Sequence, residues 1–220
     1  MEFSQLEKLF QEGETSKTNN AQFDDSGFVL VRKLFDPKEL ECDVPKERGL
    51  FHYYGSEDKF THEPVEDQVK GSVARYYWPR YKEAHHKFKK RIEEVIGKKL
   101  YTTYYYDRFY FPGQALDPHT DRGACEISIT VHIGTNLNKP WGFWVKNGKG
   151  EHCKIYMEPG DGVIYKGCER LHWRDPMPEN KKPFYKKWFS KKEDLYYHQA
   201  FFHYVLADGS RAHCAFDAAR

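Results

Sequence analysis

Two histidines and an aspartate stand at spacings that suit a metal ion. His119 and Asp121 lie two residues apart, shortly after the turn Pro112-Gly113, and His172 follows much later in the chain. On an extended segment, residues i and i+2 project to the same side, so His119 and Asp121 can bind one ion. A histidine from a distant strand would complete a set of two imidazoles and one carboxylate. This set leaves coordination positions open and is diagnostic of non-haem iron(II) oxygenases.

The residues around these ligands matter, because an H-x-D pair alone is common in a chain with 11 histidines. The run Arg108-Phe-Tyr-Phe-Pro-Gly-Gln-Ala-Leu-Asp-Pro-His-Thr-Asp-Arg122 resembles the start of the barrel core in 2-oxoglutarate-dependent oxygenases, which have a similar R-x-Y-x-P-G…P-H-x-D run. The later run Glu158-Pro-Gly-Asp-Gly-Val-Ile-Tyr-Lys-Gly167 resembles the turn and strand that deliver the second histidine of that family. Here that histidine is His172. The resemblance covers residues 100–206, about half of the chain.

The resemblance implies the cofactor and the reaction of this superfamily, whose members include prolyl 4-hydroxylases. We expect Fe(II) to be held by His119, Asp121 and His172, with 2-oxoglutarate and O2 as cosubstrates. The enzyme would be a dioxygenase, a hydroxylase that couples decarboxylation of 2-oxoglutarate to oxidation of a C–H bond. The presence of Asp121 argues against a halogenase, because halogenases of this family lack the carboxylate ligand.

The distal carboxylate of 2-oxoglutarate needs a buried cation, preferably the planar fork of an arginine. In the family this cation usually stands nine or ten positions after the second histidine, and in this chain that stretch is a lysine-rich segment. We expect Arg174 to take the role, because it lies two residues beyond His172 and therefore on the same strand face. The other candidates are Lys181, Lys182, His198 and Gln199.

Two further cosubstrate contacts follow from the resemblance. Tyr110 matches the cosubstrate-contacting tyrosine of the R-x-Y-x-P-G run, and His132 stands where related enzymes place another aromatic donor. Both assignments depend on strand register, because a slip of one residue turns every side chain to the other face. The alternative for Tyr110 is packing among its many aromatic neighbours.

The elements that must position these residues are mainly strands. Apolar residues spaced by three and four predict a helix over residues 81–96, which Gly97 ends. Alternation and turn signals predict strands over 27–34, 100–111, 126–133, 141–145, 152–157, 163–165 and 196–206. This pattern predicts a β-sandwich or barrel with helical support. The resemblance narrows it to an α+β, mainly β fold with a double-stranded β-helix (jelly-roll) core and a supporting N-terminal helical region.

The strand predicted over residues 126–133 alternates strictly between polar and apolar side chains. In an ordinary sheet the apolar face would meet the core and the polar face would meet water. If the polar face points into a barrel instead, the interior is a cavity that holds a ligand. The alternation alone leaves both arrangements open.

We expect one domain, with residues 1–99 as an N-terminal strand and helical support region and residues 100–220 as the oxygenase core. A lysine-rich insertion at 181–194 interrupts the core and mixes six lysines with four aromatic residues. Such a mixture makes nucleic-acid binding possible, although a solvated loop or an active-site lid is favoured. The substrate is expected to be a small molecule or a peptidyl group, and the sequence determines neither its identity nor the oligomeric state.

Composition sets broader limits. The net charge of +2 gives no global attraction to nucleic acid, and no apolar run approaches the roughly 20 residues that span a membrane. The five cysteines are scattered without C-x-x-C spacing, which favours free thiols in a reducing compartment. With no apolar segment typical of a signal peptide near its start, the chain is expected to be cytoplasmic.

Two other functions fit parts of the sequence. A cupin-like metal-dependent barrel enzyme is one, but such sites usually draw on an H-x-H pair, which this chain lacks. A non-catalytic barrel that binds a polyanion through the lysine-rich loop is the other. Succinate release in the presence of 2-oxoglutarate would separate both from an oxygenase.

Overall fold

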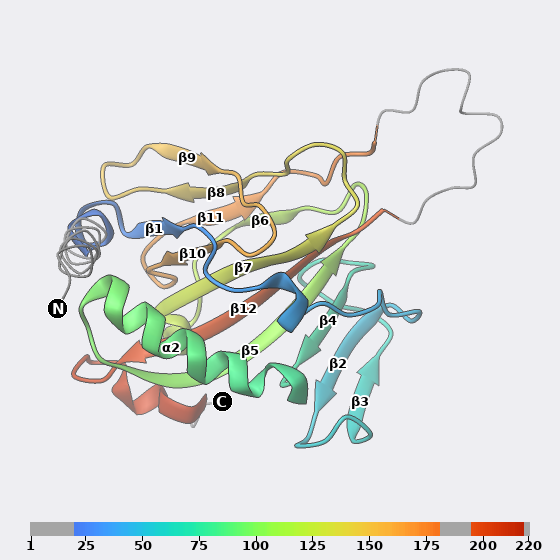
Figure 1. Cartoon of the computed structure of the whole chain (residues 1–220), viewed down its shortest axis with the longest axis horizontal. Coiled ribbons are helices and arrows are strands. Elements are labelled where there is room, and N and C mark those ends of the chain that lie inside the picture. Colours follow the sequence, from blue (N-terminus) through green and yellow to red (C-terminus); the bar gives the residue numbers. More distant parts are fainter. Residues whose placement is uncertain (1–19, 181–194, 218–220) are drawn as a thin grey trace, which may run out of the picture.

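Two sheets form the body of the molecule, and both join strands that are far apart in the sequence (Figure 1). The computed structural model describes residues 20–180 and 195–217. The larger sheet has 8 strands in the order β1-β10-β7-β12-β5-β4-β2-β3, and the smaller sheet has 4 in the order β6-β11-β8-β9. The predicted insertion at 181–194 lies outside the described residues.

The strands are β1 (Phe28–Val31), β2 (Gly49–Tyr53), β3 (Phe60–Glu63), β4 (Val73–Tyr76), β5 (Leu100–Tyr110), β6 (Leu116–His119), β7 (Ile127–Thr135), β8 (Phe143–Lys146), β9 (His152–Ile155), β10 (Gly162–Tyr165), β11 (His172–Arg174) and β12 (Tyr197–Leu206). The helices that lie wholly within the described residues are α2 (Lys82–Ile96) and the short 3-10 segments η1 (Pro37–Glu39), η2 (Pro79–Tyr81), η3 (Gly123–Cys125) and η5 (Ala212–Asp217). All seven strands predicted from the sequence are present within a few residues of their expected bounds.

Helix α2 ends as its sequence predicts. Gly97 follows the last turn with a φ of 66°, a left-handed conformation that favours glycine, and its N–H donates to the Glu93 carbonyl. One face of the helix is buried against the larger sheet, and Figure 1 shows it lying across that sheet. Among the described residues, no helix is long and apolar enough to cross a membrane.

Strand β7 turns its apolar side chains toward this helix. Its apolar residues share one buried cluster with the inner face of α2; they are Ile127, Ile129, Val131 and Ile133. Ser128, Thr130 and His132 are buried on the opposite face, between the two sheets. The polar face of the strand therefore points into the barrel, which is the second of the two arrangements that the alternation leaves open.

The connectivity is that of a double-stranded β-helix. Strand β12 returns between β5 and β7 and pairs antiparallel with both, while β11 pairs antiparallel with β6 and β8. The predicted fold class, mainly β with a double-stranded β-helix core, is confirmed.

The N-terminal residues also contribute strands. Strand β1 extends the larger sheet beyond β10, and β4, β2 and β3 extend it beyond β5. No elements were predicted for residues 41–79, and the structure places three strands there. The larger sheet thus contains residues from both predicted regions of the chain.

A buried ion pair fixes the junction between these added strands and the barrel. Asp107 of β5 accepts hydrogen bonds from Arg75 of β4, with 3.0 Å between Arg75 Nε and Asp107 Oδ1, and His198 Nε2 of β12 lies 2.8 Å from Asp107 Oδ2. All three side chains are buried, and the Arg75 guanidinium stacks 3.6 Å above the ring of Trp78. Burial acts to raise the pKa of Asp107, but Arg75 and His198 outweigh it and lower the pKa to about 2.

Replacing Asp107 with alanine should destabilise the protein by about 3–5 kcal/mol, because Arg75 would keep its charge in a buried site without a carboxylate partner. Urea unfolding at neutral pH measures this loss. The surface variant Glu83→Ala, which breaks an exposed pair with Lys87, should change stability by less than about 1 kcal/mol. Since the folded-state pKa of Asp107 is depressed, its contribution is present above about pH 4 and is lost as the pH falls toward 2. Equal, small effects of the two substitutions would contradict this account.

Candidate metal centre

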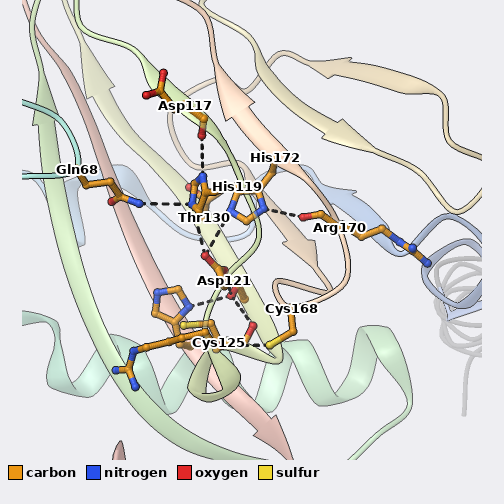
Figure 2. A network of polar contacts seen from close by, with 12 residues as sticks. Gln68, Asp117, His119, Asp121, Cys125, Thr130, Cys168, Arg170 and His172 are labelled. Atoms are coloured by element: carbon orange, nitrogen blue, oxygen red, sulfur yellow. Dashed lines mark hydrogen bonds and ion pairs between the residues drawn. The ribbon is translucent and has the colours of Figure 1, made fainter. Parts of the chain in front are cut away.

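Strands β6 and β11 bring the three predicted ligands together. His119 ends β6, Asp121 follows two residues later, and His172 begins β11 directly opposite His119 in the antiparallel pair. One ligand atom from each of the three residues lies within 4.8 Å of the other two. Figure 2 shows both imidazole rings directed at the Asp121 carboxylate.

Hydrogen bonds to the backbone fix the orientation of both rings. Nδ1 of His119 donates to the Asp117 carbonyl and Nδ1 of His172 donates to the Arg170 carbonyl, each over 2.8 Å (Figure 2). Since a carbonyl only accepts, each Nδ1 must carry the hydrogen, and each neutral ring keeps the lone pair on Nε2. Those Nε2 atoms lie 3.6 Å (His119) and 3.4 Å (His172) from Asp121 Oδ1. The two backbone carbonyls thus orient the Nε2 atoms as donors to a metal ion.

Asp121 is held in place by its own set of neighbours. The Ser128 hydroxyl lies 3.1 Å from Asp121 Oδ2 and 2.8 Å from Nδ1 of His203, which is buried behind it. The Asp121 backbone N–H donates to the Gly167 carbonyl. A Cβ atom at Gly167 would lie 2.4 Å from Asp121 Oδ2, so only glycine permits this close approach.

The charges at this site respond to one another. Burial acts to raise the pKa of Asp121, but the neighbouring imidazoles of His119 and His172 outweigh it and hold that pKa well below its usual range. Burial acts to lower the pKa of His119, but the Asp121 carboxylate and the Asp117 carbonyl outweigh it and raise that pKa. The carboxylate is therefore ionised at neutral pH and available to a cation.

The interior of the barrel holds polar atoms that no described residue satisfies. Among the residues that the structure describes, five buried side-chain atoms on the inward faces of β5, β7, β11 and β12 have no hydrogen-bond partner; they are Arg108 Nε, His132 Nε2, Arg174 Nε, Gln199 Oε1 and His203 Nε2. Each such atom costs about 1–3 kcal/mol if it stays unpaired. An interior built this way suits a polar ligand.

Arg174 is the most conspicuous of these residues. Its side chain is 1% exposed, and within the described chain its guanidinium donates only to the Trp141 carbonyl (3.0 Å) and the Tyr197 hydroxyl (3.4 Å). It also lies over the rings of Trp141 and Tyr197, at 4.5 and 4.7 Å from their centroids. Neither hydrogen-bond partner carries a negative charge, so the described residues leave this buried cation without a counterion.

The other predicted cosubstrate residues have mixed outcomes. Tyr110 is buried in the interior, with its hydroxyl 3.5 Å from Arg108 and its ring edge-on to Trp141. His132 stacks on Tyr197 at 4.1 Å, and its Nδ1 donates to the Met157 carbonyl. Its Nε2 is therefore an acceptor in the neutral ring, and burial lowers the pKa of His132 to about 4. The expected role of His132 as a donor would require protonation, which this environment opposes.

The alternative anchors are placed differently. His198 lies on the outer face of β12, where it pairs with Asp107 and stacks on Phe109. Gln199 faces the interior and donates to the Thr130 hydroxyl. Lys181 and Lys182 lie outside the described residues.

A second cluster with metal-binding residue types does not suit a cation. Cys42, Asp107 and His198 also lie within 4.8 Å of one another. The Arg75 guanidinium occupies both oxygens of Asp107 and also donates to Cys42 Sγ. A fixed positive charge already fills that site.

Sequence patterns missed several residues around the triad. Gln68 Nε2 lies 3.5 Å from His119 Nε2, and Gln68 also accepts a hydrogen bond from the buried Arg108. Ser128 and His203 support Asp121 from behind. Arg108 lies between Tyr106 and Tyr110 on one face of its strand. This position could have indicated that Arg108 points inward and needs a polar partner from elsewhere in the chain.

Comparison with known proteins supports the fold. No protein-family model matches the chain, and no curated protein matches it in sequence. Among solved structures, a 2OG-Fe(II) oxygenase family oxidoreductase from Burkholderia pseudomallei is similar with a TM-score of 0.58 at 11% identity, over 86% of this chain and 90% of that one. A Trichoplax adhaerens prolyl hydroxylase, solved with a hypoxia inducible factor peptide, is similar with a TM-score of 0.57 at 11% identity, over 93% of this chain and 94% of that one. The epimerase SnoN, solved with Fe3+, alpha ketoglutarate and nogalamycin RO, is similar with a TM-score of 0.57 at 10% identity, over 87% of this chain and 84% of that one.

The chain has the double-stranded β-helix fold of the 2OG-Fe(II) oxygenases. The similar regions cover most of this chain and most of each of these neighbours. At this level of identity the similarity establishes the fold. What the neighbours bind and catalyse is a property of those proteins.

Replacing Asp121 with asparagine should lower the pKa of His119 in the metal-free protein, because the substitution removes the charge that raises it. An NMR titration of the imidazole signals measures this pKa. Asp117→Asn is the matched control, since Asp117 contacts His119 through its backbone carbonyl and not through its carboxylate. An unchanged His119 pKa in the Asp121 variant would contradict the proposed geometry.

Proposed function

We propose that this protein is an Fe(II)- and 2-oxoglutarate-dependent dioxygenase, a hydroxylase acting on a small-molecule or peptidyl substrate. The observation that carries the proposal is the convergence of His119, Asp121 and His172, whose ligand atoms lie within 4.8 Å of one another. Two imidazoles and one carboxylate on adjoining strands are the donor set of non-haem iron(II) oxygenases. The fold is one in which such sites are found.

The donor set fits an iron(II) ion. Both Nε2 lone pairs are free of hydrogen because each Nδ1 donates to a carbonyl, and Asp121 is ionised. In this proposal, His119, Asp121 and His172 hold the ion, and Ser128 keeps the carboxylate oriented. With iron(II) held there, O2 would supply the oxidising power: one oxygen atom would oxidise 2-oxoglutarate to succinate and CO2, and the other would be available for a C–H bond of the substrate.

The buried cation fits the far end of 2-oxoglutarate. Arg174 lies two residues beyond His172 on β11, a step of roughly 7 Å along a strand, which is comparable with the length of a five-carbon diacid. A carboxylate there would give Arg174 the counterion that the described residues lack, through a charge-assisted pair. The Tyr197 hydroxyl, 3.4 Å from the same guanidinium, offers a further donor. Tyr110 would line the same chamber.

Exposure indicates the side from which a substrate would approach. The side chain of His119 is 27% exposed and that of His172 is 2% exposed. The triad is therefore reached from the His119 side, while His172 and Arg174 face the closed interior. A substrate would meet the site beside β6, and the cosubstrate would extend inward toward Arg174.

Metal binding should depend on pH through the protonation states of His119 and Asp121. His119 must be neutral to bind a metal, and its raised pKa means that a proton competes with the ion at mildly acidic pH. Asp121 stays ionised throughout this range.

The rings of Trp141 and Tyr197 cover the guanidinium of Arg174 and exclude water from it.

The competing functions are less well supported. A cupin-like site would be expected to draw on more histidines, whereas the third donor here is Asp121. A polyanion-binding barrel would rely on the lysine-rich loop, which lies outside the described residues. Epimerisation, the activity named for one structural neighbour, differs from hydroxylation in that the product gains no oxygen. A product mass increased by one oxygen atom would support hydroxylation.

His119→Ala and Asp121→Ala should each abolish iron-dependent decarboxylation of 2-oxoglutarate, because each removes one of three metal ligands. Succinate formation by the iron-loaded protein measures this activity. The control is His152→Ala, which removes an exposed histidine on β9 and should leave the rate unchanged. Normal succinate formation by both triad variants would disprove the assignment.

Arg174→Gln should raise the dissociation constant for 2-oxoglutarate on the order of 100-fold, because the variant leaves a buried carboxylate without its ion pair. Metal affinity should stay within a few-fold of wild type, since Arg174 contacts none of the three ligands. Calorimetry measures the metal affinity with the metal-free protein and the 2-oxoglutarate affinity with the metal-loaded protein. Arg91→Gln, on the exposed face of α2, is the control. Unchanged affinity for 2-oxoglutarate would assign the anchor to another residue.

A further inference from the structure

Gln68 reaches the triad from outside the barrel core. It lies in the connection between β3 and β4, and its Nε2 is 3.5 Å from Nε2 of His119 (Figure 2). The hydrogen on the His119 ring is on Nδ1, which donates to the Asp117 carbonyl, so Nε2 is an acceptor. The Gln68 amide therefore directs its N–H at the same lone pair that a metal would use.

The direction of this amide is fixed by chemistry. Gln68 Oε1 lies 2.9 Å from Nη2 of Arg108. A guanidinium only donates, so the atom facing Arg108 must be the amide oxygen and the atom facing His119 must be the NH2 group. Arg108 is fully buried and belongs to β5, one of the long strands of the barrel. The amide is thus held by a rigid element.

The whole connection is tied to the same arginine. Glu66 is buried, and its Oε1 lies 3.0 Å from Arg108 Nη2. The other oxygen, Oε2, accepts from the Val69 backbone N–H (2.6 Å) and the Ser72 hydroxyl (3.2 Å). Glu66 therefore neutralises Arg108 and closes the turn that presents Gln68. The group offered to the site at this point is a neutral donor and not a cation.

A metal on the triad would change the partner of this donor. The His119 lone pair would be committed to the ion, while Arg108 would still hold the amide oxygen. The NH2 group would then face the ligand sphere beside His119 without its acceptor. Gln68 is an exposed residue, so this donor is accessible to an oxygen of whatever ligand the ion takes up.

We propose that Gln68 is a cosubstrate-binding residue, whose Nε2 donates to a carboxylate or 2-oxo oxygen at the metal-binding end of a 2-oxo acid. This inference rests on the proposed function. It assigns the two ends of the cosubstrate to different parts of the chain. Arg174 would hold the distal carboxylate, and the Glu66–Arg108–Gln68 group, from the N-terminal region and β5, would hold the end beside His119.

Two ligands separate these roles. 2-Oxoglutarate carries both ends, whereas pyruvate carries only the 2-oxo acid end. Calorimetry measures the affinity for Zn(II), a redox-inert ion, with the metal-free protein, and the affinity for each 2-oxo acid with the Zn(II)-loaded protein, without any turnover. The variants are Gln68→Leu, Gln68→Glu and Arg174→Gln, with Gln22→Leu as the control because Gln22 is exposed and remote from the triad.

We expect Gln68→Leu to weaken the binding of both 2-oxoglutarate and pyruvate by about 10-fold, the effect of one hydrogen bond to a charged group. Zn(II) affinity and the melting temperature should stay close to wild type. Arg174→Gln should weaken the binding of 2-oxoglutarate and leave the binding of pyruvate unchanged. Gln68→Glu should keep the bond to Arg108 but place a negative charge beside the cosubstrate, so its loss of affinity should exceed that of the leucine variant.

Wild-type affinity of Gln68→Leu for both 2-oxo acids would overturn the inference and leave the proposed function standing. A Gln68→Leu protein that loses Zn(II) or melts early would also overturn it, because Gln68 would then support the triad or the fold. A wild-type protein that binds Zn(II) but neither 2-oxo acid would overturn the inference together with the proposed function.

Discussion

The apolar side chains of β7 face helix α2, and this leaves the polar side chains of the strand inside the barrel. Ile129 and Val131 belong to the core under the helix, while Ser128, Thr130 and His132 are buried between the sheets. A sheet packed this way buries hydroxyls and imidazoles that must find partners. The interior can meet that demand through polar contacts across the barrel, a metal ion or a charged ligand. The metal triad, its supporting Ser128, and Arg174, which has no counterion among the described residues, all depend on this inward orientation of the polar side chains.

Two buried arginines inside the barrel illustrate how charge is distributed there. Arg108 has Glu66 as a counterion at 3.0 Å, supplied by a segment far away in the sequence. Arg174 has only a carbonyl and a phenol as hydrogen-bond partners within the described residues. A buried cation without a counterion is strongly unfavourable in a protein interior. Arg108 therefore acts in the architecture of the site, and Arg174 is the arginine with capacity to bind an anion.

Much of this arrangement could be predicted from the sequence because it depends on local patterns. The spacing of His119 and Asp121 and the P-G-D turn before His172 indicate the triad, and strict alternation indicates the long strands. Strand β3 escaped prediction because all four of its residues are exposed, so it has no apolar face to alternate. Strand β11 is three residues long and exists only through its pairing with β6 and β8.

Residues whose roles depend on distant partners could not be predicted. The Gln68 amide is held in place by Arg108, forty residues later in the chain, and no local sequence pattern marks Gln68. His132 was expected as a donor from its strand position, but its tautomer depends on the Met157 carbonyl across the barrel. The sequence also offers His198 as an anchor for the distal carboxylate, but the pairing of His198 with Asp107 places it on the other face of β12. In each case tertiary contacts decide the chemistry of the side chain.

The central claim is that one polar chamber holds a metal ion at the triad and a diacid that reaches Arg174. Diffraction from crystals grown with Zn(II) and 2-oxoglutarate, recorded at the zinc absorption edge, tests both parts at once. The account predicts one anomalous peak at about 2.0–2.2 Å from Nε2 of His119, Nε2 of His172 and an oxygen of Asp121, with diacid density extending from it to Arg174. A peak at Cys42, Asp107 and His198, or an empty triad under saturating Zn(II), would contradict it.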